Sequence, residues 1–205
     1  MTAHPRIYLA SLSPRRRDLL TQIGVKFEVL LLRADARRNA DVDETPQERE
    51  APGDYVLRIA QAKANAGLAA LRYRRLPVFP VLAADTTVTL DGRILGKPAD
   101  RDEATHMLRQ LSGRQHRVLT AVAIAFDDRV EVRLSETAVT FVPLSEERIR
   151  RYVFTSEPHD KAGAYGIQGH AGAFVQRIEG SYSGVVGLPL AETAELLQLS
   201  GYPVP

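Results

Sequence analysis

Residues 7–24 have the sequence IYLASLSPRRRDLLTQIG, an apolar run followed by a polar turn and an amphipathic segment. Residues 6–11 predict a strand, and Ser13-Pro14 predicts the start of a helix, because serine is a preferred N-cap and proline fits the first helical position. Leu19 and Leu20 mark one helical face, and Gly24 is a typical helix end. The stretch therefore predicts the strand-turn-helix unit of an α/β protein.

The rest of the chain repeats this alternation. Asp54, Asp100, Ser145 and Pro189 each precede a helical pattern, and Asp91-Gly92 is typical of a type I′ hairpin turn. The other predicted strands are residues 27–32, 78–84, 86–90, 93–95, 118–126, 130–141, 174–178 and 182–186, and residues 33–53 are expected to form a loop. The sequence thus predicts a single α/β domain over residues 1–205 with a mixed sheet.

Composition limits the classes of function. The 205 residues are 44% hydrophobic, enough for a substantial core, and 27 basic against 25 acidic side chains leave a net charge of only +2. The absence of cysteine excludes a thiolate nucleophile, and 6% aromatic residues do not favour a nucleic-acid partner. Neither a secretory signal nor an apolar run of membrane-spanning length is present, so we expect a cytoplasmic protein without a membrane partner.

The arginines that open the first predicted helix need a reason. Arg15 and Arg16 would face the positive end of the helix dipole, which is unfavourable unless an anion lies there. With the hydroxyls of Ser11 and Ser13 and the free N–H groups of a first helical turn, they describe a cradle for a polyphosphate. A surface helix with solvated arginines explains the same residues equally well.

Two further side chains are unusual for their expected positions. Lys63 continues the apolar stripe of Val56, Ile59 and Ala60, so it must reach solvent, pair with an acid or meet an anionic ligand. Asp85 follows an apolar strand at its carboxyl end, where ligands bind in open α/β sheets and where turn-forming aspartates also occur.

The predicted hairpin connects Asp85 to a second lysine. Its register places Thr86 opposite Lys97, beside Asp85 but on the other side of the ribbon unless a bulge at Gly96 redirects a side chain. Farther along, four glycines between Gly163 and Gly172 indicate either a backbone that approaches a ligand or an ordinary loop. Gln168 lies in this glycine-containing segment. Its side-chain amide both donates and accepts hydrogen bonds, as recognition of a base edge would need.

Taken together, these segments resemble the Maf family of nucleoside triphosphate pyrophosphatases. The matching segments are ASLSPRR at 10–16, AKA at 62–64, AADTTV at 83–88, GKP at 96–98, LSG at 111–113, DKAGAYGIQG at 160–169 and VVGLPL at 185–190. They cover nearly the whole chain in family order. The resemblance implies a Maf/ITPase-like α/β fold, an elongated mixed β-sheet flanked by helices, with two lobes and a deep active-site cleft.

The resemblance also implies roles. Such enzymes cleave a nucleoside triphosphate between the α and β phosphates with a divalent metal cation, Mg²⁺ or Mn²⁺, and the matching subgroup acts on dTTP and UTP. Asp85 matches the proton acceptor, and Glu44 matches an acid that shares the metal with Asp85. The remaining matches are Arg16, Thr86 and Gln168 for substrate specificity, and Ser11, Ser13, Arg15, Lys63 and Lys97 for phosphate binding.

Two alternatives remain open at this stage. A related subgroup handles other nucleotides such as 7-methyl-GTP, and the family was first linked to inhibition of septum formation, which would suit a non-catalytic regulator of cell division. A regulator would not need Asp85, Lys63 and Lys97 together with a metal-binding acid, so the residues favour the enzyme. A homodimer is compatible with the resemblance and with the frequency of dimers among soluble proteins.

Overall fold

The structure is a computed structural model that describes residues 6–33 and 41–204. The chain divides into two compact units. The first unit consists of Met1–Asp85, Thr120–Leu134 and Gly187–Pro205, and the second consists of Thr86–Leu119 and Ser135–Val186. Because β3, β5 and β6 contribute residues to both, the division does not follow sequence order.

The described strands form one mixed sheet, as predicted. They are β1 (Ile7–Leu9), β2 (Phe27–Val29), β3 (Val81–Leu90), β4 (Arg93–Leu95), β5 (Gln115–Phe126), β6 (Arg129–Phe141) and β7 (Val175–Glu179). Their order is β2-β1-β3-β5-β6-β7, with β4 on β3. The strand β1 pairs in parallel with β2 and β3, whereas β4 on β3 and β7 on β6 are antiparallel.

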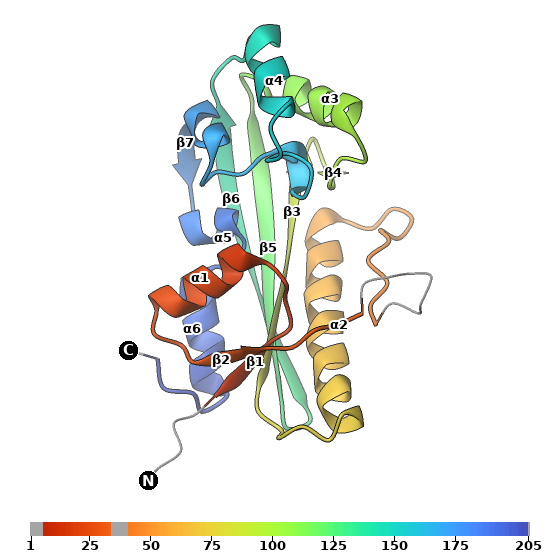
Figure 1. Ribbon diagram of the computed structural model, residues 1–205, viewed down its shortest axis with the longest axis vertical. Helices are drawn as coiled ribbons and strands as arrows, with labels where there is room; N and C mark the ends of the chain where they lie inside the picture. Colours follow the sequence, from red (N-terminus) through yellow and green to blue (C-terminus); the bar gives the residue numbers. More distant parts are fainter. Residues whose placement is uncertain (1–5, 34–40, 205) are drawn as a thin grey trace. The chain divides into compact units, whose positions relative to one another are not determined.

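Helices flank the strands of the first unit. In Figure 1, α2 (Pro52–Tyr73) lies on one side of the strands, and α1 (Pro14–Gln22) and α6 (Leu190–Leu199) lie on the other. Leu20, Ile59 and Leu82 are fully buried between these layers. Gly67 permits a close approach of α2, because a Cβ there would lie 2.6 Å from Cγ1 of Val81. Along the part of the chain that the structure describes, no helix is both long and apolar enough to cross a bilayer.

The second unit has its own core. Its helices are α3 (Arg101–Leu111), α4 (Glu146–Val153) and the short α5 (Tyr182–Val186), joined by the 3₁₀ segments η2 (Ala162–Ala164) and η3 (His170–Phe174). Side chains from α3, α4, β6 and both 3₁₀ segments pack into one cluster that includes Leu108, Phe141, Ile149, Ala164 and Phe174. This core holds the glycine-rich loop of residues 163–172 against helices and strands.

Several local predictions are confirmed. Asp91 and Gly92 both have positive φ, 52° and 77°, as a type I′ turn requires. The carboxylate of Asp100 accepts a hydrogen bond from the Glu103 N–H at 2.9 Å, and the Ser145 hydroxyl accepts from the Arg148 N–H at 3.2 Å. Turn and cap chemistry therefore fixes these ends as the sequence indicates.

Other local predictions are wrong. Helix α2 begins at Pro52 after an N-cap at Ala51, so Asp54 lies in the first turn rather than at the cap. Residues 182–186 form α5 instead of a strand, because the Ser181 hydroxyl accepts from the Gly184 N–H at 3.0 Å and starts a helical turn.

The predicted strand and loop at residues 27–53 also change. Strand β2 ends at Val29, three residues before the predicted end. Of the predicted loop 33–53, residues 34–40 lie outside the described residues, and residues 41–51 run without helix or strand to the start of α2.

Candidate functional site

Asp85 occupies the middle of a strand. The sequence predicts a strand end at Ala84, but β3 continues without interruption from Val81 to Leu90. Only 8% of Asp85 is exposed, and residues 81–84 before it are completely buried. A carboxylate is rarely buried in this way unless it is paired, so its partners decide what it can do.

The partner of Asp85 is Lys63 on α2. The Nζ atom of Lys63 donates to Oδ1 of Asp85 at 2.8 Å and lies 2.9 Å from Oε1 of Glu44. Both members of the buried pair are shielded, with side chains 15% and 11% exposed, whereas Glu44 is 48% exposed. Of the three options for a lysine on an apolar stripe, the structure thus shows pairing with acids. We call Glu44, Lys63 and Asp85 the acid–lysine cluster.

Arg16 connects three segments beside this cluster. Its Nη1 donates to the Ala84 carbonyl at 2.7 Å and to the Ser11 hydroxyl at 3.2 Å, and its Nε donates to the Gly187 carbonyl at 2.7 Å. Burial lowers the pKa of Arg16, while the negative charges of Asp85 and Glu44 act in the opposite direction. Arg16 therefore holds the turn before α1 against the strand that carries Asp85.

The turn before α1 differs from a conventional helix cap. Ser13 occupies the N-cap position and Pro14 the first turn, as predicted, but the Ser13 side chain makes no capping hydrogen bond within the described chain. Instead, the Ser11 hydroxyl accepts from the Ser13 N–H at 3.2 Å. Arg15 is half-buried at the same turn. The Ser11 hydroxyl therefore takes the place of the Ser13 side chain in ordering this turn.

Tyr55 and Arg58, which no sequence pattern singles out, hold the segment that carries Glu44. The Tyr55 hydroxyl donates to the Glu44 carbonyl at 3.1 Å, and Nη2 of Arg58 donates to the Thr45 carbonyl at 3.1 Å. Arg58 also pairs with Glu50 at 2.6 Å, and these bonds lower the pKa of Glu50 to about 2. Both side chains lie on the first turns of α2. Their partners lie in the preceding loop, whose path cannot be predicted from sequence, so no sequence pattern indicates the contact.

The charges of Asp85 and Glu44 both act on Tyr55. Burial raises the pKa of Tyr55 to about 12, and the negative charges of Asp85 and Glu44 both contribute. A phenol in this position stays protonated at neutral pH and can only stabilise the loop or donate a hydrogen bond.

The cluster suits a cation even though it is not a complete metal site. Within residues 6–33 and 41–204, no group of three or more histidine, cysteine, aspartate or glutamate side chains could hold a metal ion. Glu44 and Asp85, however, already converge on one cation, the Lys63 ammonium. Mg²⁺ commonly takes one or two carboxylates and completes its shell with phosphate oxygens and water, so the residues present fit such an ion.

The second unit carries Thr86, Lys97 and Gln168. Thr86 is half-buried and follows Asp85 in β3, whereas Lys97 and Gln168 are exposed. In the hairpin, Leu90 lies opposite Arg93 and Val88 lies opposite Leu95, the register of a two-residue Asp91-Gly92 turn. Strand β4 ends at Leu95, so the predicted pairing of Thr86 with Lys97 is not part of the ladder. Instead, the Gly96 carbonyl accepts from the Gly163 N–H at 3.1 Å and joins the lysine segment to the glycine-rich loop.

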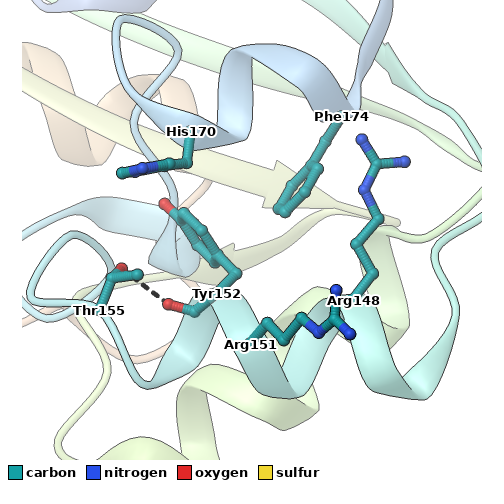
Figure 2. Close-up of a pocket in the computed structure, with 6 residues that line it drawn as sticks. All are labelled: Arg148, Arg151, Tyr152, Thr155, His170 and Phe174. Atoms are coloured by element: carbon teal, nitrogen blue, oxygen red, sulfur yellow. Dashed lines mark hydrogen bonds between the residues drawn. The ribbon is translucent and has the colours of Figure 1, made fainter.

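A pocket of about 180 Å³ opens beside α4 in the second unit (Figure 2). The residues that line it are Arg148, Arg151, Tyr152, Thr155, His170 and Phe174. The Arg148 guanidinium lies 4.8 Å from the centre of the Phe174 ring, and Arg151 pairs with Glu147. None of these lining residues is among the site residues predicted from the sequence.

Comparison with known proteins identifies the family. The family described as Maf-like protein matches residues 6–200 of this chain. The chain belongs to the Maf family. Its relatives include the dTTP/UTP pyrophosphatase of Nitrosomonas europaea, 57% identical over 97% of this chain and 96% of that protein, and the dTTP/UTP pyrophosphatase of Aromatoleum aromaticum, 56% identical over 97% of both. A third, from Dechloromonas aromatica, is 53% identical over 96% of this chain and 98% of its own.

Family membership confirms the resemblance that the seven sequence segments carry. The similarity to these Maf proteins extends over almost the full length of each chain. The acid–lysine cluster draws its side chains from three separated segments of the Maf sequence. The roles assigned to individual side chains are predictions.

Proposed function

We propose that this Maf protein is a dTTP/UTP pyrophosphatase that hydrolyses the bond between the α and β phosphates. The products are the nucleoside monophosphate and pyrophosphate. Support comes from three relatives at 53–57% identity, each of which is named dTTP/UTP pyrophosphatase. The observation that carries the mechanism is the acid–lysine cluster, in which a buried Asp85 lies within hydrogen-bond distance of a shielded ammonium.

Asp85 is the proposed general base. It accepts a proton from the attacking water, the water oxygen bonds to phosphorus, and the pyrophosphate side of the cleaved bond leaves with the electron pair. Lys63 contributes a positive charge beside the carboxylates of Glu44 and Asp85. This charge lowers the repulsion between the two carboxylates and an anionic substrate. Such hydrolysis depends mainly on positioning and on neutralising charge on the phosphoryl oxygens.

Glu44 and Asp85 are the residues that would hold a divalent cation. When bound, Mg²⁺ or Mn²⁺ would neutralise phosphate charge and so reduce the barrier to attack. The bonds from Tyr55 and Arg58 keep the Glu44 segment beside α2, which reduces the conformational entropy that the segment would lose when the cation binds.

The cationic and hydroxyl groups have complementary roles in this proposal. Ser11, Ser13 and Arg15 bind phosphate oxygens at the start of α1, and Lys97 adds a further positive charge. Arg16 joins the turn before α1 to β3 through its bonds to Ser11 and Ala84, and together with Thr86 and Gln168 it sets the choice of substrate in this proposal. Thr86 and Gln168 select the base, since a glutamine amide can donate to a pyrimidine carbonyl and accept from its N3–H.

A pyrophosphate-release assay over a panel of triphosphates tests this function. With Mg²⁺ present, dTTP and UTP should be cleaved with kcat/KM at least about tenfold above dCTP, dATP, dGTP and 7-methyl-GTP, which corresponds to roughly 1.4 kcal/mol of discrimination. A preference for 7-methyl-GTP would move the chain to a different substrate class. If pyrophosphate is released from none of these nucleotides, the enzyme is rejected in favour of a regulator.

The same assay with chelator, and then with Mg²⁺ or Mn²⁺ restored, tests whether hydrolysis depends on a divalent cation.

Cytoplasmic localisation and a homodimer belong to the proposal as well. Cell fractionation would test the first, and light scattering would test the second.

A further inference from the structure

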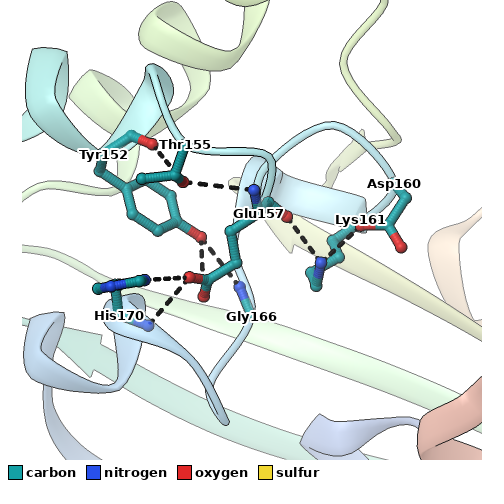
Figure 3. Close-up of polar contacts among 7 residues, drawn as sticks. All are labelled: Tyr152, Thr155, Glu157, Asp160, Lys161, Gly166 and His170. Atoms are coloured by element: carbon teal, nitrogen blue, oxygen red, sulfur yellow. Dashed lines mark hydrogen bonds and ion pairs between the residues drawn. The ribbon is translucent and has the colours of Figure 1, made fainter.

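The carboxylate of Glu157 is almost enclosed within the second unit. Its side chain is 15% exposed, and Oε2 accepts hydrogen bonds from the His170 backbone N–H at 3.0 Å and from Nδ1 of the same residue at 2.8 Å (Figure 3). Oε1 accepts a weaker bond from the Tyr152 hydroxyl at 3.4 Å. Partial burial raises the pKa of Glu157, but the bonds from His170 and from the Ala171 backbone outweigh it, so the pKa falls below the usual value. The group is therefore an anion at neutral pH.

The backbone of the glycine-rich loop is shaped around this carboxylate. A Cβ on Gly169 would lie 2.0 Å from Oε1 of Glu157, although the φ of Gly169, −106°, is one that any residue can adopt. A side chain here would displace the carboxylate of Glu157, whereas the backbone angle itself does not require glycine. The loop and Glu157 therefore occupy positions that depend on each other.

Two further side chains hold the other end of the same loop. The Tyr152 hydroxyl accepts from the Gly166 N–H at 3.3 Å, and a Cβ on Gly166 would lie 2.8 Å from Cε of Lys161. Lys161 is itself tied to the Glu157 carbonyl at 2.7 Å. Figure 3 shows Glu157 between the Gly166 side and the His170 side of the loop.

Gln168 lies between these two attachment points. It is exposed, and its side-chain amide makes no hydrogen bond to the described residues. The amide is therefore available to a ligand. The backbone that carries it is held by hydrogen bonds at residues 166 and 170. The position of a side chain that recognises the base is fixed in this way by residues that do not themselves contact the base.

We propose that Glu157 is a positioning residue that fixes the loop of residues 166–170 so that Gln168 can select the pyrimidine base. This inference rests on the proposed function, in which Gln168 reads the base. Glu157 has no contact with substrate in this account. It acts through the bonds to His170 and through its fit under Gly169, and it has no part in phosphate binding.

The test compares Glu157→Ala with Gln168→Ala and the double variant. Each single change should raise KM for dTTP and UTP by about tenfold with kcat changed less than about threefold, because base contacts are lost while the reacting groups stay in place. Inhibition by inorganic tripolyphosphate, which has no base, should change less than about twofold. Glu147→Ala, on the exposed face of α4, is the matched control and should behave like the wild type.

The double-mutant cycle decides whether Glu157 acts through Gln168. If it does, the double variant should be within about twofold of the worse single variant. Multiplied effects of about a hundredfold, or tripolyphosphate inhibition that weakens in parallel with the nucleotide, would overturn the inference.

Glu157→Ala is checked for folding by its thermal midpoint, and Gly169→Ala supplies a second approach. The new Cβ in Gly169→Ala must displace the Glu157 carboxylate, so this variant should raise KM in the same way as Glu157→Ala. An unchanged KM in Gly169→Ala would contradict the inference. If Glu157→Ala leaves KM unchanged while the wild type cleaves dTTP, the inference fails and the proposed function stands. If the wild type releases no pyrophosphate, calorimetric binding of α,β-methylene-dTTP still measures whether Glu157→Ala weakens base recognition.

Discussion

Lys63 shows how one side chain determines the chemistry available to its neighbours. Its ammonium lies between two carboxylates, one of them on a buried strand, and each is within 2.9 Å. Removing one member of a shielded ion pair leaves the other charge uncompensated, whereas removing both members is much less costly. Stability and activity should therefore respond differently to single and paired changes.

Lys63→Met should reduce the free energy of unfolding by about 2 kcal/mol, since Asp85 loses its partner while still buried. Adding Asp85→Asn should restore most of that loss, because a neutral amide replaces the stranded carboxylate. Urea unfolding at pH 7 measures both, and Arg72→Met, which breaks an exposed pair with Asp128, is the control. A double variant less stable than Lys63→Met would contradict the pairing.

His116 makes a second prediction, this time for pH dependence. Burial lowers its pKa to about 4, and its Nε2 lies 2.8 Å from the Tyr165 hydroxyl. The folded pKa is below the unfolded value of about 6.5, so the unfolded chain takes up the proton first as pH falls. Between pH 6.5 and 4, this group should reduce the free energy of unfolding by about 3 kcal/mol.

Comparing His116→Phe with the wild type isolates that contribution. The stability difference between the two should change in favour of the variant as pH decreases from 7 to 4, measured by urea unfolding at each pH. His106→Phe, at an exposed site on α3, is the control for the change from histidine to phenylalanine itself. Parallel curves for His116→Phe and the wild type would mean that the group titrates normally in the folded protein.

At the scale of elements, the starts of α1 and α3 illustrate two uses of the same position. Asp100 caps α3 by accepting from the Glu103 N–H. Ser13 occupies the equivalent position of α1 without a capping bond to the described chain. A helix start whose N-cap side chain makes no such bond is a place where an anion can bind.

Changing both caps to alanine should separate stability from binding. Asp100→Ala should lower the free energy of unfolding by about 1 kcal/mol, whereas Ser13→Ala should change it by less than about 0.5 kcal/mol. Ser13→Ala should instead weaken inhibition by tripolyphosphate several-fold, which Asp100→Ala should not do. If Ser13→Ala destabilises the protein as much as Asp100→Ala, then the hydroxyl serves the helix and not a ligand.

At the scale of the whole molecule, local chemistry was predicted well and long-range pairing was not. The Asp91-Gly92 turn and the Asp100 and Ser145 caps depend on neighbours within three residues, and they are confirmed. Asp85 looked like a strand end because an unpaired carboxylate inside a strand is unfavourable. Its partner, Lys63, lies 22 residues earlier on another element, and no local pattern joins the two.

The site was predicted to a similar degree. Lys63 and Asp85 were found as anomalies of pattern, and Glu44 through family resemblance, and the structure brings these three together. Glu157 was missed because its importance lies in filling the space under Gly169. Valine-rich residues 182–186 were assigned to a strand because β-branched side chains favour one, but the hydrogen bond to Ser181 outweighs that preference.

Product analysis of dTTP hydrolysis by the wild type and by Asp85→Asn tests the central claim most directly. With Mg²⁺, the wild type should give dTMP and pyrophosphate, and Asp85→Asn should be slower by about 10³-fold while its folding and its binding of α,β-methylene-dTTP are retained. Asp128→Asn, an exposed aspartate in the same unit, should match the wild type. Formation of dTDP and inorganic phosphate, or turnover by Asp85→Asn at the wild-type rate, would contradict the account.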